Sequence, residues 1–149
     1  MLRLLHYSDI ENAYDDPDRL ARLAGTIETR RDADTLVFGT GDNTSPGILP
    51  LVTKGEQALD FFHAVDPDAD TFGNHDFDYG PDRALDIIER APQPWLCANV
   101  ERGGEQFGHE SSVRPWQIFE RDGQRVGVFG LVTPKTASIN PAIEDVVFT

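Results

Sequence analysis

The sequence contains a single cysteine, Cys97, among its 149 residues. One cysteine excludes an intramolecular disulfide bond and any zinc site that is built from several thiolates. Cys97 lies within an apolar run, Pro94 to Val100. We therefore expect it to be a small, buried core residue and not a reactive thiol.

Long apolar runs are also absent. No stretch approaches the roughly 18–20 apolar residues that cross a bilayer. The first nine residues lack the charged and apolar segments of a signal peptide. We therefore expect no membrane partner and a cytoplasmic location. Apolar residues still make up 39% of the chain, which is typical of one globular domain with its own core.

Basic residues are scarce. The chain has 13 Lys and Arg against 26 Asp and Glu, which gives a formal net charge of −13. Proteins meet nucleic-acid backbones with Lys and Arg, so we expect no nucleic-acid polymer as partner. Such a charge also destabilises the compact state unless salt screens it. We interpret it as adaptation to high salt in a halophile, with an ordinary acidic enzyme as the alternative.

Short apolar runs alternate with helical patterns over the first hundred residues. Helices are predicted to begin at Asp16-Pro17, at a capping box formed by Thr53 and Glu56, and at Pro81. Buried strands are predicted at Leu2–Ser8, Asp34–Gly39, Ala69–Gly73 and Trp95–Val100. This βα rhythm predicts an α/β fold with a parallel sheet.

The pattern changes after residue 115. Asp122-Gly123 separates two apolar runs and predicts a β-hairpin. A further strand is expected at Val146–Phe148. No linker, repeat or low-complexity tract divides the chain, so residues 1–149 are interpreted as part of a single domain.

Polar residues follow the first three predicted strands at similar intervals. Asp42 comes 33 residues after Asp9, and Asn74 comes 32 residues after Asp42. The carboxyl ends of neighbouring parallel strands share one edge of a sheet, where ligands bind. We therefore expect the side chains at this edge to converge on one crevice: Asp9, Glu11, Asp42, Asn74 and His75.

These side chains suit a metal site better than a nucleophilic triad, because no Ser or Cys stands beside a base in a suitable context. Carboxylate, amide and imidazole groups are ligands for hard or borderline divalent cations. Asp42 is placed to bridge two ions about 3.5–4 Å apart, as in two-metal hydrolytic sites. His75 and Asp78, three residues apart, form a natural oriented pair.

The motifs resemble those of 5′-nucleotidases in the calcineurin-like metallophosphoesterase superfamily. Residues 73–80, Gly-Asn-His-Asp-Phe-Asp-Tyr-Gly, resemble the Gly-Asn-His-Glu-Phe-Asp-x-Gly box of that family. Gly41-Asp42 resembles its Gly-Asp box, and Leu4 to Asp9 resembles its opening strand. The resemblance covers nearly the whole chain and implies a four-layer αββα sandwich, of which this chain is the N-terminal part.

The resemblance also implies individual roles. Asp9 ligates a first metal ion, Asp42 bridges two ions, and Asn74 ligates the second. His75 lies over the substrate phosphate and Asp78 orients it. The implied activity is hydrolysis of phosphate esters, with nucleotides as the substrate class, through in-line attack by a metal-bridged hydroxide.

Two departures from the family pattern bear on these roles. The first box is Asp-x-His in the family, whereas here Glu11 takes the place of the histidine. An oxygen donor there favours Mn²⁺ or Mg²⁺ over Zn²⁺. The family draws further ligands from downstream Gly-His and Gly-His-x-His motifs. The remaining histidines after Asp42 are His63 and His109, and neither has that setting, although His109 follows Gly108. A nucleotide-recognition domain is likewise not found in these residues.

Three hypotheses follow from these observations. The favoured one is a two-metal phosphoesterase. The first alternative is a non-catalytic fragment that keeps the fold and binds metal weakly, and the second is a receiver-like phosphotransfer domain that uses Asp9 and Asp42. An exposed sheet edge is expected to promote self-association of the isolated chain.

Overall fold

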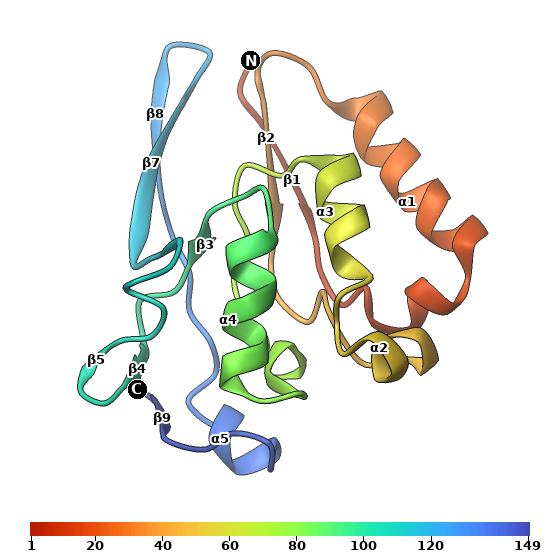
Figure 1. Ribbon diagram of the computed structural model, residues 1–149. Coiled ribbons are helices and arrows are strands. Elements are labelled where there is room, and N and C mark those ends of the chain that lie inside the picture. The colour runs from red at the N-terminus through yellow and green to blue at the C-terminus, as the bar shows by residue number, and fades with distance from the viewer.

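Parallel strands run through the centre of the structure, a computed structural model that describes all of residues 1–149 (Figure 1). β1 (Arg3–Tyr7) pairs in parallel with β2 (Thr35–Gly39). Isolated parallel bridges, Phe38 with Ala69 and Asp70 with Trp95, continue the arrangement to β3 (Trp95–Leu96). β3 in turn pairs in parallel with β6 (Val113–Arg114). The predicted α/β fold with parallel strands is confirmed.

Helices form the connections from β1 to β2 and from β2 to β3. The α-helices are α1 (Pro17–Arg30), α2 (Ile48–Thr53), α3 (Ala58–Val65), α4 (Pro81–Arg90) and α5 (Thr136–Ile139), and the 3₁₀ helices are η1 (Glu11–Asp15) and η2 (His75–Phe77). α1 begins as predicted, because the Asp16 carboxylate accepts hydrogen bonds from the backbone N–H groups of Asp18 and Arg19, both at 3.1 Å.

The capping box predicted at Thr53 and Glu56 is wrong. Thr53 is the last residue of α2, and its hydroxyl donates to the Leu49 carbonyl within that helix at 2.9 Å. Lys54 then adopts a left-handed conformation, with φ of 53°, which ends the helix. α3 starts only at Ala58.

Two cores lie on opposite faces of the parallel strands. Val37 of β2 belongs to the large core that α1, α3 and α4 cover, whereas Leu36 belongs to a smaller core on the other face. That smaller core is closed by Phe119 of a hairpin, β7 (Trp116–Arg121) and β8 (Gln124–Phe129). Helices, parallel strands and the hairpin thus form three successive layers (Figure 1).

The hairpin prediction is confirmed, because Asp122 and Gly123 join β7 and β8 with φ of 52° and 68°. Positive φ at both central residues is the signature of the tight turn that fits the twist of two strands. The predicted strand at Val146–Phe148 is also present as β9 (Val146–Phe148).

Two predicted strands are shorter than expected. Residues 69–73 contribute only the two bridge residues, Ala69 and Asp70. The run from Trp95 to Val100 divides, because Val100 starts β4 (Val100–Arg102), which pairs in antiparallel with β5 (Glu105–Gln106) and β9. Cys97, at the division, is buried as predicted, and burial raises the pKa of its thiol to about 11.

β1 is not the buried strand that its apolar sequence predicts. It pairs with β2 on one side only, and Leu4 is 55% exposed. β1 is therefore an edge strand with unpaired backbone groups. No helix of the structure has the length and apolar character needed to cross a membrane.

Candidate metal centre

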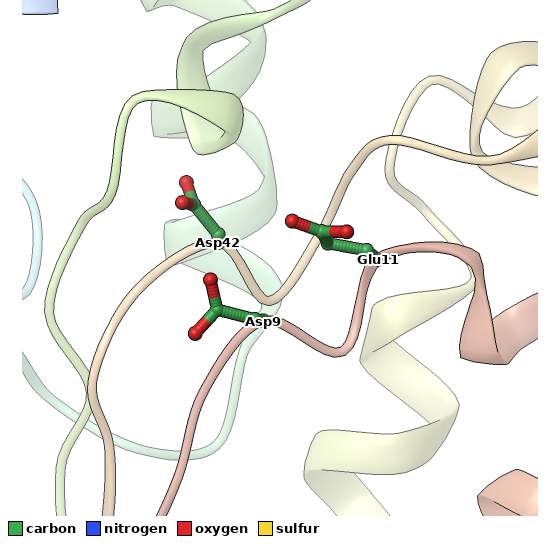
Figure 2. Close-up of side chains that lie close together, drawn as sticks. All are labelled: Asp9, Glu11 and Asp42. Carbon is green, nitrogen blue, oxygen red and sulfur yellow. The ribbon is translucent and has the colours of Figure 1, made fainter.

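Three carboxylates meet at the carboxyl ends of β1 and β2. Asp9 and Glu11 follow β1, Asp42 follows β2, and one oxygen of each lies within 4.8 Å of the others. Figure 2 shows the side chains converging from these two loops. The parallel pairing of β1 and β2 therefore brings together residues that are more than 30 positions apart in the sequence.

All three residues have left-handed backbone conformations. The φ angles of Asp9, Glu11 and Asp42 are 53°, 46° and 54°. Asp tolerates this region better than most residues because its short side chain can bond locally, whereas Glu has no such advantage. Backbone strain of this kind is concentrated at functional sites, where the surrounding structure enforces it.

Two glycines let the loops after β2 and after residue 72 touch. A Cβ atom on Gly41 would lie 2.7 Å from the Gly73 nitrogen, and one on Gly73 would lie 2.2 Å from Oδ1 of Asp42. Neither position accepts a side chain without moving the backbone. The Gly-Asp and Gly-Asn-His sequences therefore serve the close approach of the residues that follow each glycine.

The carboxylate of Asp76 holds these two loops together. One carboxylate oxygen accepts hydrogen bonds from the N–H groups of Asp42 and Gly73, both at 2.8 Å. The other accepts from the N–H groups of Asn43 and Thr44 at 3.1 Å, and from the Thr44 hydroxyl at 2.8 Å. Sequence reasoning gave Asp76 no role, although its place inside the Gly-Asn-His box was a signal.

His75 lies directly against Asp42. Its backbone N–H donates to Oδ1 of Asp42 at 2.7 Å. Its Nδ1 atom lies 3.0 Å and 3.2 Å from the two carboxylate oxygens of Asp78. Asp78 also accepts a hydrogen bond from the Ser45 hydroxyl at 2.8 Å. The structure thus contains the His75–Asp78 pair that the three-residue spacing predicts.

Asn74 precedes this pair in the same loop. Its carbonyl oxygen accepts a hydrogen bond from the side chain of Asn140 at 2.8 Å. Its own side chain caps no helix. The Asn74 amide oxygen is therefore not committed to the start of η2, which leaves it available as an oxygen donor.

Comparison with known proteins decides the family. The family described as calcineurin-like phosphoesterase matches residues 2–132. The chain belongs to that family. The match overturns the receiver-like alternative, since it covers both Asp9 and Asp42 within a phosphoesterase domain.

Several relatives of this phosphoesterase chain are much longer than it is. It is 30% identical to a 5′-nucleotidase of Diplobatis ommata over 74% of its own length and 19% of the relative. It is 27% identical to the trifunctional nucleotide phosphoesterase protein YfkN of Bacillus subtilis, over 99% of its length and 12% of the relative. The chain thus spans less than a fifth of either protein.

Solved structures agree on the fold. The 5′-nucleotidase precursor from Thermus thermophilus aligns with a TM-score of 0.80 and 25% identity, covering 98% of this chain and 31% of that one. The NAD nucleotidase of Haemophilus influenzae aligns with a TM-score of 0.81 and 23% identity, covering 98% and 29%. The chain therefore has the fold of the N-terminal domain of 5′-nucleotidase-type metallophosphoesterases.

The charge of the site favours a cation. Burial raises the pKa of Asp42, the N–H and charge of His75 oppose this, and Asp9 adds to the rise. None of the ion pairs of the phosphoesterase chain that involve Lys or Arg includes Asp9, Glu11 or Asp42. Calcineurin-like phosphoesterases use divalent metal ions, and these oxygen donors suit such ions.

Proposed function

We propose that this chain forms the N-terminal part of the active site of a metal-dependent phosphoesterase of the 5′-nucleotidase type, which hydrolyses phosphate esters of nucleotides. The observation that carries the proposal is the cluster of Asp9, Glu11 and Asp42 beside the His75–Asp78 pair. Relatives named as 5′-nucleotidases and a nucleotide phosphoesterase support the substrate class.

The oxygen donors have distinct proposed roles toward two divalent ions. Asp9 and Glu11, on the loop after β1, would hold the first ion, and Asn74 would hold the second. Asp42 would contribute to both. When bound, the ions would supply an activated water and neutralise charge on the phosphoryl group.

His75 would act on the phosphate from its free nitrogen. Asp78, when ionised, can only accept a hydrogen bond, so Nδ1 of His75 would carry the proton between them and Nε2 would be left for the phosphate. Partial burial lowers the pKa of His75, but the hydrogen bond to Asp78 and the charges of Asp78, Asp42 and Glu11 raise it by more. The protonated imidazole, which the raised pKa favours, can stabilise phosphate charge and donate a proton to the leaving oxygen.

Glu11 sets the proposed metal preference. A carboxylate in place of an imidazole favours Mn²⁺ or Mg²⁺ over Zn²⁺ at the first site. The added negative charge would also make an ion held there less effective at ionising a bound water at neutral pH. We therefore propose Mn²⁺ or Mg²⁺ as the working metals, with Zn²⁺ as a poorer substitute.

Three wider proposals accompany this one. Residues 1–149 form the N-terminal portion of a larger domain, whose remaining half and nucleotide-recognition domain lie outside them. The charge of −13 reflects a protein that works at high salt. The unpaired edge of β1 and the exposed Leu4 side chain promote self-association of the isolated chain. The cytoplasmic location stays a prediction, since one matched structure is of a precursor.

The test is Mn²⁺-dependent hydrolysis of AMP and of a generic phosphodiester in molar KCl. His75→Ala is compared with His109→Ala, because His109 is half exposed and pairs with Glu105, away from Asp78. Activity that is lost in His75→Ala and kept in His109→Ala supports the proposal. No activity in any of the three proteins would favour the alternative, a non-catalytic fragment that binds metal weakly, and equal activity in all three would contradict the role of His75.

A further inference from the structure

Asn140 reaches the candidate site from the end of α5. It is only 5% exposed. Its Nδ2 group donates to the carbonyl oxygen of Asn74 at 2.8 Å and to Oδ1 of Asp78 at 3.0 Å. Its Oδ1 atom accepts a hydrogen bond from the backbone N–H of Ala142 at 3.0 Å. One buried side chain thus contacts two residues that precede it by 66 and 62 positions.

The orientation of this amide is fixed by its partners. A flipped amide would place its oxygen against the Asn74 carbonyl and the Asp78 carboxylate, both of which are acceptors. It would also turn its NH₂ group toward the N–H group of Ala142. Only the observed orientation satisfies every group around the side chain.

The Asp78 carboxylate is held in place by hydrogen bonds to both of its oxygens. Oδ1 accepts from Asn140, and Oδ2 accepts from the Ser45 hydroxyl at 2.8 Å. Both oxygens then present their remaining lone pairs to Nδ1 of His75. Without Asn140, the Asp78 side chain could rotate, and His75 would lose the acceptor that fixes its tautomer and ring orientation.

We propose that Asn140 is a positioning residue, which fixes Asp78 so that His75 keeps its proton on Nδ1 and presents Nε2 to the phosphate. The same amide anchors the Asn74 carbonyl, so the proposed metal ligand and the His75–Asp78 pair share one support. The chemical consequence rests on the proposed function, whereas the effect on the His75 tautomer does not.

The test measures the tautomer of His75 by long-range ¹H–¹⁵N correlation NMR, at a pH above the observed titration of its own imidazole. In the wild-type chain we expect Nδ1–H to dominate. Asn140→Ala should produce a mixture with a substantial Nε2–H share, and Asn140→Asp a larger one, because a second carboxylate then faces Asp78. Asp78→Ala should produce the same change, and adding Asn140→Ala to it should change nothing further.

Asn99 provides the matched control. Its Nδ2 group donates to the carbonyls of Val132 and Thr149, both at 2.7 Å, and its Oδ1 atom accepts from the Val132 N–H at 2.9 Å. Asn99→Ala removes at least as many hydrogen bonds but should leave the His75 tautomer unchanged. An unchanged tautomer in Asn140→Ala, or an equal change in Asn99→Ala, would overturn the proposal.

Two further readouts keep the inference testable. If the Asn140 variants do not fold, the side-chain NH₂ signal of Asn140 in the folded chain should move in Asp78→Ala and not in His109→Ala; no movement contradicts the contact. If the chain hydrolyses phosphate esters, Asn140→Ala should lower kcat roughly 10-fold or more, with a smaller change in KM. Absence of hydrolysis in every protein defeats the proposed function, while the tautomer still decides the role of Asn140.

Discussion

Replacing Asp76 by alanine should destabilise the fold strongly for a single substitution. Four backbone N–H groups and one hydroxyl donate to this carboxylate, and the N–H groups of Asn43 and Thr44 are buried while those of Asp42 and Gly73 are partly buried. An unsatisfied buried donor costs about 1–3 kcal/mol, so the two buried N–H groups account for about 2 kcal/mol at the low end and the two partly buried ones add to this. Removing the carboxylate also relieves the cost of burying its charge, the same cost that raises its pKa to about 6. We therefore expect a net loss of about 2–5 kcal/mol.

Urea unfolding at pH 8, followed by the fluorescence of the buried Trp95, measures this loss. For a domain of this size it corresponds to a fall in Tm of about 5–15 °C. Asp60→Ala is the matched control, because Asp60 is exposed in the first turn of α3. That variant should stay within about 1 kcal/mol of the wild type. A loss of under about 1 kcal/mol in Asp76→Ala would refute the reasoning, since water would then replace the carboxylate at little cost.

The remaining predictions concern charge. Burial and the charge of Asp76 raise the pKa of Asp70 well above its usual value, so the contribution of Asp70 to stability should be lost as the pH rises from about 4 through that raised pKa. Asp70→Asn should therefore be more stable than the wild type at pH 8 by about 1 kcal/mol or more, with a smaller gap at pH 4 in urea unfolding; the opposite order would contradict this. Mn²⁺ at 100 times its Kd should stabilise the chain by about 2.7 kcal/mol, and EDTA or Asp42→Asn should remove that gain in a thermal melt. Glu11→His should shift preference from Mn²⁺ toward Zn²⁺ in competitive binding, and unchanged preference would mean that Glu11 does not ligate. Molar KCl should raise Tm above its value in dilute buffer, and a flat dependence would count against adaptation to salt.

The order of the elements could be predicted because its signals are local. Asp16 followed by Pro17 marks the start of α1, and Asp122-Gly123 marks the hairpin turn. The lengths of the strands were not predictable in the same way. Ala69 and Asp70 pair with neighbours while residues 71–73 do not, because residue 73 is committed to the loop that Asp76 holds. The point at which such a strand ends depends on contacts between distant segments, and these contacts produce no periodic pattern in the sequence.

The residues of the candidate site also divide into those that the sequence predicts and those that only the structure reveals. Asp9, Glu11 and Asp42 meet because parallel strands end at one edge, and that rule applies to a sequence before its structure is known. The supports of the site follow no such rule. Asp76 accepts from donors that lie 32 to 34 positions before it as well as from the nearby Gly73, and Asn140 donates to partners more than 60 positions before it. An asparagine near the end of a short helix carries no local sign of either contact.

The hydrogen bonds of Asp76 explain how three neighbouring carboxylates can stay close together. Three carboxylates lie within 4.8 Å of one another, on backbone conformations that are costly for Glu11 and uncommon for Asp9 and Asp42. Repulsion among them would separate flexible loops. Asp76 prevents this for the Asp42 loop by hydrogen bonds to three consecutive N–H groups, Asp42 to Thr44. The same carboxylate ties Gly73, and thereby the loop that carries His75, to the Asp42 loop. The folded scaffold therefore offsets the repulsion between the negative charges before any cation binds. Because the loops need not reorganise, the attraction between the cation and the carboxylates contributes directly to binding affinity.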